Sequence, residues 1–217
     1  MIVFNKDILF IHNPKCAGTT LGYFLLQHLK RPVYNAGRPE IGTYHPSVDL
    51  ALGYACGIIG QEPADFQKIV STIRNPYSRE VSMYYYFRQI LSDSETNSYD
   101  INNEIIEYCV NLSKTLELNQ YIECLYEMFG TIDIYNIKQY INSYSACNFH
   151  IMKVEHVKRD FRPFISSFCS ELDFPKQLER HNRSHHLNHT NELSQTSISI
   201  INKCYSEIFD IFKYRIL

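Results

Sequence analysis

A short apolar run near the start of the chain is followed by a lysine, a glycine and two threonines. The run is Ile8–Ile11, and the loop after it reads Pro14-Lys15-Cys16-Ala17-Gly18-Thr19-Thr20. Apolar residues then recur at helical spacing, at Leu21, Phe24, Leu25 and Leu29. The pattern is that of a strand, a loop and a helix. Because the start of a helix offers backbone N–H groups and a positive dipole end, it predicts a phosphate-binding loop.

This loop differs from the usual nucleotide-binding P-loop, G-x-x-x-x-G-K-[ST], in which the lysine directly follows the second glycine. Here Asn13 replaces the first glycine, Thr19 follows Gly18, and the lysine lies upstream at Lys15. The arrangement suits a short phosphate-like group and lacks the lysine that usually reaches a β- or γ-phosphate. These residues alone leave an alternative open, in which Thr19 or Thr20 caps the helix and Lys15 is an exposed side chain.

A second segment has the same construction. The β-branched run 69–73 ends at Arg74-Asn75-Pro76, and the helix expected after it carries Ser82. Ligands of open parallel sheets gather at the carboxyl ends of the strands. Lys15 and Arg74 are therefore expected at one edge of the sheet, where they suit a ligand with two separated anionic groups.

The two segments together resemble the sulfotransferase superfamily, and within it the carbohydrate-type enzymes that use 3′-phosphoadenylyl sulfate (PAPS). Pro14 to Thr20 match the family's loop P-K-[TCS]-[AG]-[GS]-[TS]-[TS] at each position. The family's second motif is R-[ND]-P-[YWF]-x-R-x-x-S-x-[YF]. It is matched by Arg74, Asn75, Pro76, Tyr77, Arg79, Ser82 and Tyr84.

The resemblance implies roles for these residues. Arg74 and Ser82 are expected to hold the 3′-phosphate of PAPS. Lys15 is expected to act in catalysis as well, by neutralising the charge that develops on the leaving 3′,5′-ADP. No metal is expected, since no phosphate-bridging carboxylate motif accompanies the loop. The phosphosulfate is expected to be held by the whole first loop: Pro14, Lys15, Cys16, Ala17, Gly18, Thr19 and Thr20.

A segment between the two motifs supplies a candidate general base. Residues 44–49, Tyr-His-Pro-Ser-Val-Asp, resemble the family segment H-[AP]-[ST]-x-x-[ED]. His45 is accordingly expected to take the proton of the acceptor hydroxyl, since histidine has a suitable pKa near neutral pH. Alternatively, His45 caps the helix that starts near Ser47. His12 is the next candidate base, although its place at the end of a strand favours a role in packing.

Three later segments resemble the family more weakly. Residues 151–156 resemble its late strand, and residues 205–214 resemble its terminal helix, Y-x-x-D-[FY]-x-x-F-[GK]-Y. Residues 180–184 resemble a P-H-x-N-x-S loop in which an arginine replaces the proline. The last resemblance implies that Asn182 and Arg183 also contact the cofactor.

Strands alternating with helices predict an α/β fold with a central parallel sheet flanked by helices, the P-loop-like sulfotransferase fold. We expect a single domain, residues 1–217, with a mainly helical insertion or cap at about 93–149. Strands are expected at about 8–12, 69–73 and 150–154, with shorter ones near 2–4 and 33–35. Helices are expected at about 19–30, 47–58, 78–92, 101–128, 134–145, 159–171 and 195–212.

Composition limits the class of partner. With a net charge of −2, the chain has no global basic field for nucleic acid or acidic membranes, so local positive potential is expected from Lys15, Arg74 and Arg79. Seven cysteines without a C-x-x-C pair favour reduced thiols. With no charged-then-apolar leader and no apolar run of about 18 residues, we expect a soluble cytoplasmic protein of microbial or viral type.

The expected reaction is in-line transfer of the sulfuryl group of PAPS to a hydroxyl of a carbohydrate or other small acceptor. A P-loop-like kinase is an alternative, against which the displaced Lys15 and the Arg74-Asn75-Pro76 motif argue. A catalytically idle nucleotide-binding protein is another, against which the presence of both Lys15 and His45 argues.

Overall fold

The computed structural model describes residues 2–29, 32–35, 48–89, 104–139, 149–166 and 191–217. The chain falls into two compact units. The α/β unit comprises Met1–Arg74 and Ile137–Arg183, and the helical unit comprises Asn75–Asn136 and Ser184–Leu217. None of the helices in these described ranges is both long and apolar enough to cross a membrane.

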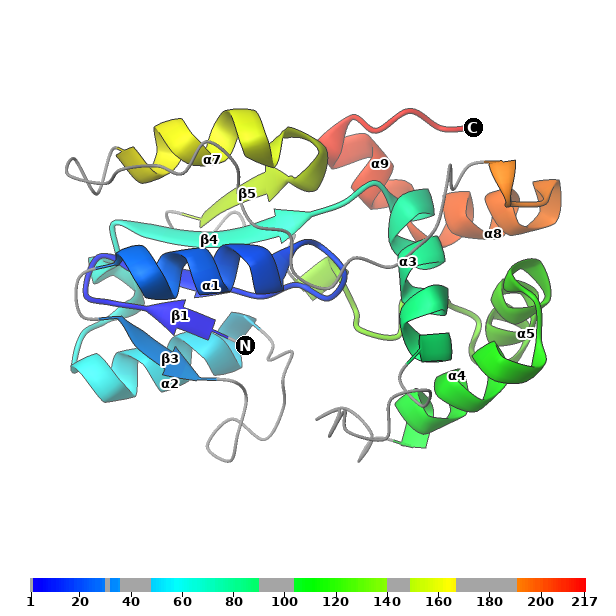
Figure 1. Cartoon of the computed structure of the whole chain (residues 1–217), viewed down its shortest axis with the longest axis horizontal. Helices are drawn as coiled ribbons and strands as arrows, with labels where there is room; N and C mark the ends of the chain where they lie inside the picture. Colours follow the sequence, from blue (N-terminus) through cyan, green and yellow to red (C-terminus); the bar gives the residue numbers. More distant parts are fainter. Residues whose placement is uncertain (1, 30–31, 36–47, 90–103, 140–148, 167–190) are drawn as a thin grey trace. The chain divides into compact units, whose positions relative to one another are not determined.

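The α/β unit is built on a five-stranded sheet in the order β3-β1-β2-β4-β5 (Figure 1). β2, β4 and β5 are parallel neighbours, whereas β1 is antiparallel to both β2 and β3. Four strands therefore run one way and β1 runs the other, so the sheet is mostly parallel. The strands are β1 (Ile2–Phe4), β2 (Ile8–Ile11), β3 (Val33–Asn35), β4 (Lys68–Ile73) and β5 (Phe149–Lys153).

The expected central parallel sheet is confirmed as a mostly parallel one, and the short connection of β1 to β2 explains why β1 is reversed. Only residues 5–7 separate the two strands, and a parallel pair needs a crossover of about a dozen residues or more. Asn5 shapes the turn, because its side-chain oxygen accepts hydrogen bonds from the backbone N–H groups of Asp7 and Ile8, both at 2.9 Å. An asparagine in this position is typical of a turn.

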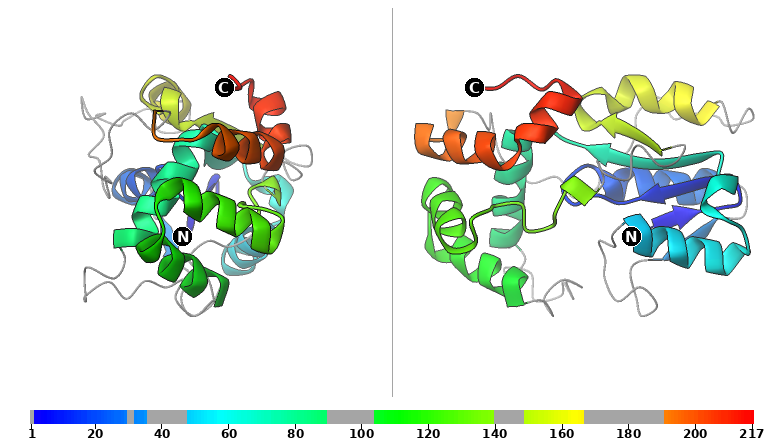
Figure 2. Two further views of the ribbon diagram at one scale, coloured as in Figure 1. Left: turned by 90° about the vertical axis from the view of Figure 1, so that its right-hand side faces the viewer. Right: turned by 180° about the vertical axis from the view of Figure 1, so that it is seen from behind.

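Helices cover both faces of the sheet. α1 (Gly18–His28) and α7 (Val157–Ser166) lie on one face, and α2 (Val48–Ile59) lies on the other (Figure 2). Short 3-10 turns, η1 (Pro63–Asp65) and η3 (Val154–His156), precede β4 and follow β5. The larger core lies under α1 and α7 and is formed by Val3, Ile8, Phe10, Leu21, Phe24, Leu25, Leu29, Val70, Met152, Val157 and Phe161.

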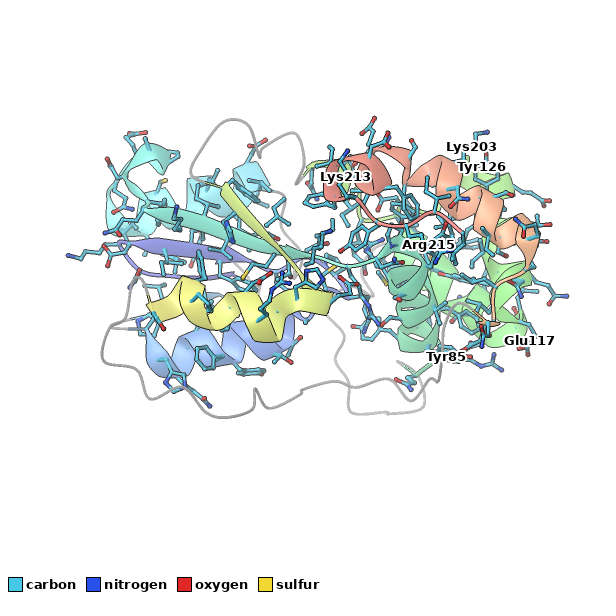
Figure 3. All side chains as sticks on the ribbon, turned by 90° about the horizontal axis from the view of Figure 1, so that it is seen from above. Tyr85, Glu117, Tyr126, Lys203, Lys213 and Arg215 are labelled. Atoms are coloured by element: carbon cyan, nitrogen blue, oxygen red, sulfur yellow. The ribbon has the colours of Figure 1, made fainter. Side chains whose placement is uncertain are left out.

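Five helices form the described part of the helical unit. They are α3 (Pro76–Gln89), α4 (Glu104–Thr115), α5 (Leu118–Phe129), α8 (Gln195–Cys204) and α9 (Ser206–Phe212). α3 contacts α4, α5 and α8, and α5 packs along α8. At that last contact, the Lys203 ammonium lies 5.2 Å from the centre of the Tyr126 ring (Figure 3).

The single helices expected at 101–128 and 195–212 are each two helices. Glu117 ends the first run, because its side chain and that of Gln120 form a capping box that starts α5. Tyr205 interrupts the second run with a non-helical backbone between α8 and α9. Of the other expected helices, 134–145 extends beyond the described residues, and 159–171 corresponds in its described part to α7.

The start of α1 packs tightly against the end of β2. His12 is 4% exposed, and its ring lies against Gly18, the first residue of α1. A Cβ atom on Gly18 would lie only 1.8 Å from Cδ2 of His12. The glycine therefore permits a close approach between the helix and the strand end, and His12 serves packing.

We expect Gly18→Ala to destabilise the protein by about 1–3 kcal/mol, because the new methyl group overlaps the His12 ring. Adding His12→Ala should relieve the overlap, so the double variant should be more stable than the sum of the single effects by at least about 1 kcal/mol. Urea unfolding measures all three variants. Gly53→Ala is the control: nothing lies within 4 Å of its Cβ position, and it should stabilise α2 by about 0.5–1 kcal/mol. Additive effects at positions 12 and 18 would contradict the prediction.

Candidate anion-binding site

The loop between β2 and α1 is held by side chains from the neighbouring strand β4. The amide nitrogen of Asn13 donates to the Thr72 carbonyl at 2.9 Å. The Thr72 hydroxyl donates in turn to the Cys16 carbonyl at 2.5 Å. Both side chains are buried, so water does not compete with these bonds. β4 thereby fixes the path of the loop at both ends of the Lys15 turn.

Two residues of the loop have an unusual backbone conformation. Lys15 and Ala17 both have a left-handed backbone, with φ of 58° and 59°. This conformation is uncommon for residues other than glycine, and left-handed residues in loops often occur in the concave backbone segments that bind anions. Ala17 is the N-cap of α1, and no side chain caps it. The alternative in which Thr19 or Thr20 caps the helix is therefore wrong, since both lie within its first turn.

Arg74 lies beside Lys15 at the carboxyl edge of the sheet, as the sequence predicts. The two are brought together because β2 and β4 are paired and Arg74 directly follows β4. An Nη1 hydrogen of Arg74 is donated to the Lys15 carbonyl at 3.3 Å. Burial, and next to it the positive charge of Arg74, lower the pKa of the Lys15 ammonium to about 8. An anion bound near both cations would lower the electrostatic free energy of each, so the pair makes this loop a candidate anion site.

The second motif is divided between the two units. Arg74 belongs to the α/β unit, whereas Asn75 and the residues after it belong to the helical unit. Ser82 lies on α3 and is 3% exposed. Tyr77 is buried as well: its hydroxyl pairs with Asn202 and accepts from the Leu217 N–H group at 2.9 Å.

Arg79 does not contribute positive potential at a surface, so that expectation is wrong. Its side chain is 1% exposed, and its guanidinium pairs with the Glu80 carboxylate at 2.7 Å. The motif's spacing cannot distinguish an arginine that faces a ligand from one that is neutralised inside the protein.

The remaining predicted site residues, His45, Asn182 and Arg183, lie outside the described residues. The loop is held by Thr72, which the sequence analysis did not single out, and by Asn13, which it named only as the residue in place of the first glycine. The signal that could have found Thr72 is a polar side chain at a fully buried position of a strand.

No protein-family model matches this sequence, and none of the curated proteins compared with it matches either. The resemblance described above therefore depends on the motif residues alone.

We expect Lys15→Met to stabilise the unliganded protein at pH 7 and to weaken anion binding. A fall in pKa from 10.5 to about 8 corresponds to about 3 kcal/mol of unfavourable free energy in the charged folded form. Methionine keeps the apolar stem without the charge, so the free energy of unfolding should increase by about 1–3 kcal/mol. Urea unfolding measures it, with the exposed Lys6→Met as the control.

The gain should depend on pH. Between pH 8 and 10.5 the folded protein has released a proton that the unfolded chain still holds, so wild-type stability rises with pH across this window. The difference between variant and wild type should therefore be smaller at pH 9.5 than at pH 7. A Lys15→Met protein that is less stable than wild type at pH 7 would contradict this account.

Proposed function

We propose that this protein is a PAPS-dependent sulfotransferase that transfers the sulfuryl group to a hydroxyl of a carbohydrate acceptor. The observation that carries the proposal is that Lys15 and Arg74 lie side by side at the sheet edge. Each positive charge raises the electrostatic free energy of the other, and a bound anion would lower the free energy of both. The loop that bears Lys15 also starts a helix, whose dipole adds to the attraction. The match of this loop and of the Arg74 segment to the family motifs supplies the choice of ligand.

In this proposal the first loop, Pro14 to Thr20, holds the phosphosulfate, and Arg74 and Ser82 hold the 3′-phosphate. During in-line transfer, negative charge moves from the sulfuryl group onto the leaving phosphate oxygen. Lys15 stabilises that charge through its ammonium group, and the loop N–H groups add preorganised dipoles. Bound phosphate raises the pKa of Lys15 again, so the amine is fully charged when the sulfur–oxygen bond breaks.

A base must remove the proton of the acceptor hydroxyl as its oxygen bonds to sulfur. His45 is proposed for this step from its position in the sequence between the two motifs. Asn182 and Arg183 are proposed as further cofactor contacts on the same kind of argument.

3′,5′-ADP should raise the melting temperature measurably, whereas ATP with Mg²⁺ should not, because ATP has no 3′-phosphate for Arg74 and Ser82. A ligand stabilises the fold by an amount set by its concentration relative to its dissociation constant. Thermal unfolding with each nucleotide at equal concentration measures the difference, with 5′-AMP as the matched ligand that lacks only the 3′-phosphate. If ATP with Mg²⁺ stabilises the protein as much as 3′,5′-ADP, the kinase alternative replaces this proposal.

His45→Ala should lower turnover by about 10²–10⁴-fold, the usual contribution of a positioned base, while 3′,5′-ADP affinity stays within about twofold. The wild-type rate should fall as the pH drops through the pKa of the histidine, and the variant should lack that limb. Steady-state kinetics with saturating PAPS over pH 5–8 measure both effects. A variant with the wild-type rate and pH profile would show that His45 is a loop or capping residue.

A further inference from the structure

Three polar groups in the helical unit form a closed ring of hydrogen bonds. Nη1 of Arg79 donates to the Glu80 carboxylate at 2.7 Å and to the Tyr205 hydroxyl at 2.9 Å. The Tyr205 hydroxyl donates to the same Glu80 oxygen, Oε1, at 2.7 Å. The Asp133 carboxylate lies 3.7 Å from Nη1 of Arg79 and adds a second negative charge. Each member of the ring therefore contacts the other two.

The ring lies wholly inside the unit. Arg79, Glu80 and Tyr205 are 1%, 4% and 0% exposed. Burial raises the pKa of the Glu80 carboxyl, and the Arg79 charge and the Tyr205 hydrogen bond act in the opposite direction. Breaking such a group leaves a charge buried without compensation and is strongly destabilising, whereas well-packed apolar replacements of the whole group are often neutral or stabilising. Stability alone therefore does not account for an ionic ring at this position, and fixed geometry is the property that it adds.

The geometry that the ring fixes is the rotation of α3. Residues three apart on a helix share a face, so Arg79 and Ser82 lie on the same side of α3, one turn apart. Tyr205 stands between α8 and α9, far along the chain from Arg79. The ring thus fastens the Ser82 face of α3 to the junction of the last two helices. Two of the ring's three hydrogen bonds join α3 to Tyr205, at 2.9 Å from Arg79 and 2.7 Å to Glu80, and they leave little freedom for α3 to turn or slide at this point.

We infer that Arg79 and Tyr205 are positioning residues, which act through Ser82 on recognition of a 3′-phosphate. The inference rests on the proposed function, because Ser82 is assigned its ligand there. It adds that the terminal helical segment takes part in nucleotide selectivity, and that the second arginine of the Arg74–Tyr84 motif recognises no ligand itself. A hydroxyl bonds a phosphate oxygen well only within a narrow range of distance and angle, so a small rotation of α3 weakens that bond.

A measurement of selectivity separates positioning from general stability. The quantity is the ratio of the dissociation constants of 5′-AMP and 3′,5′-ADP, obtained by calorimetry. A variant that is only less stable keeps this ratio, because both nucleotides share every feature except the 3′-phosphate. Tyr205→Phe removes two bonds of the ring and keeps the aromatic ring in place. Glu80→Gln, which keeps the shape of the side chain, serves the same purpose if Tyr205→Phe does not fold.

Tyr77→Phe is the matched control. Tyr77 is also a buried tyrosine hydroxyl, bonded to Asn202 and Leu217, so its loss removes a comparable pair of contacts from the same helix. It lies about 140° around the helix from Ser82, by the 3.6-residue period, and is not in the ring. The control should lower the melting temperature and leave the selectivity ratio unchanged.

We expect Tyr205→Phe to lower the ratio about 5–10-fold, because 3′,5′-ADP binds more weakly while the affinity for 5′-AMP stays unchanged. Ser82→Ala should lower the same ratio by about tenfold. In the double variant Tyr205→Phe should add nothing to the effect of Ser82→Ala, since it acts through that residue. An unchanged ratio in Tyr205→Phe or Glu80→Gln, or additive effects in the double variant, would overturn the inference and leave the proposed function intact. A wild-type protein without preference for 3′,5′-ADP would overturn both.

Discussion

The candidate site depends on the parallel pairing of β2 with β4. The register of the pair, with Leu9 opposite Ile69 and Phe10 opposite Val70, brings both strand ends to one edge of the sheet. From there Thr72 can reach the loop carbonyl of Cys16. A shift of one residue would turn every side chain of β4 to the opposite face and remove this contact. The parallel pairing of two strands that are buried on both faces, and not the loop sequence by itself, places Lys15 beside Arg74.

The loop carries two local features that are unfavourable by themselves. Two non-glycine residues have a left-handed backbone, and a half-buried lysine is adjacent to an arginine. Each of these features costs on the order of 1–3 kcal/mol. Such features persist where the surrounding structure enforces them and another interaction compensates for their cost. In the proposed function, the bound anion is such an interaction. The hydrogen bonds from Asn13 and Thr72 supply the enforcement, so the loop is preorganised and need not order when the ligand binds.

Sequence patterns predicted the parts of this structure that depend on local apolar spacing. The strands at β2, β4 and β5 and the helices α1 and α2 lie close to their expected bounds, because each has an apolar face that must be buried. The direction of β1 could have been predicted from its short connection to β2, which excludes a crossover. The division of the long helices at Glu117 and Tyr205 could not be read from periodicity, since the apolar pattern continues across both. Those ends are decided by a capping box and by the tertiary contacts of Tyr205.

The burial of Arg79 shows why motif spacing alone is an incomplete guide to a site. α3 is rich in polar residues, yet the side chains of Tyr77, Arg79, Glu80 and Tyr84 are all buried within the helical unit. A helix of this composition can be buried only if its polar groups find partners. The partners come from distant positions: Asn202 and Leu217 for Tyr77, Tyr205 for Arg79, and the Leu116 carbonyl for Tyr84.

The segment that follows Arg74 therefore serves two physical needs at once. Its first arginine faces the sheet edge beside Lys15, and most of the residues after it build the interior of the helical unit. Because an arginine has the same side chain in both settings, the sequence cannot assign the setting. The setting of each arginine is decided by the carboxylate and hydroxyl groups that the fold places around its guanidinium. Arg79 lies within reach of two carboxylates and a phenol inside the helical unit, whereas Arg74 lies beside Lys15, and this difference in neighbours favours Arg74 over Arg79 as the arginine of the proposed anion site.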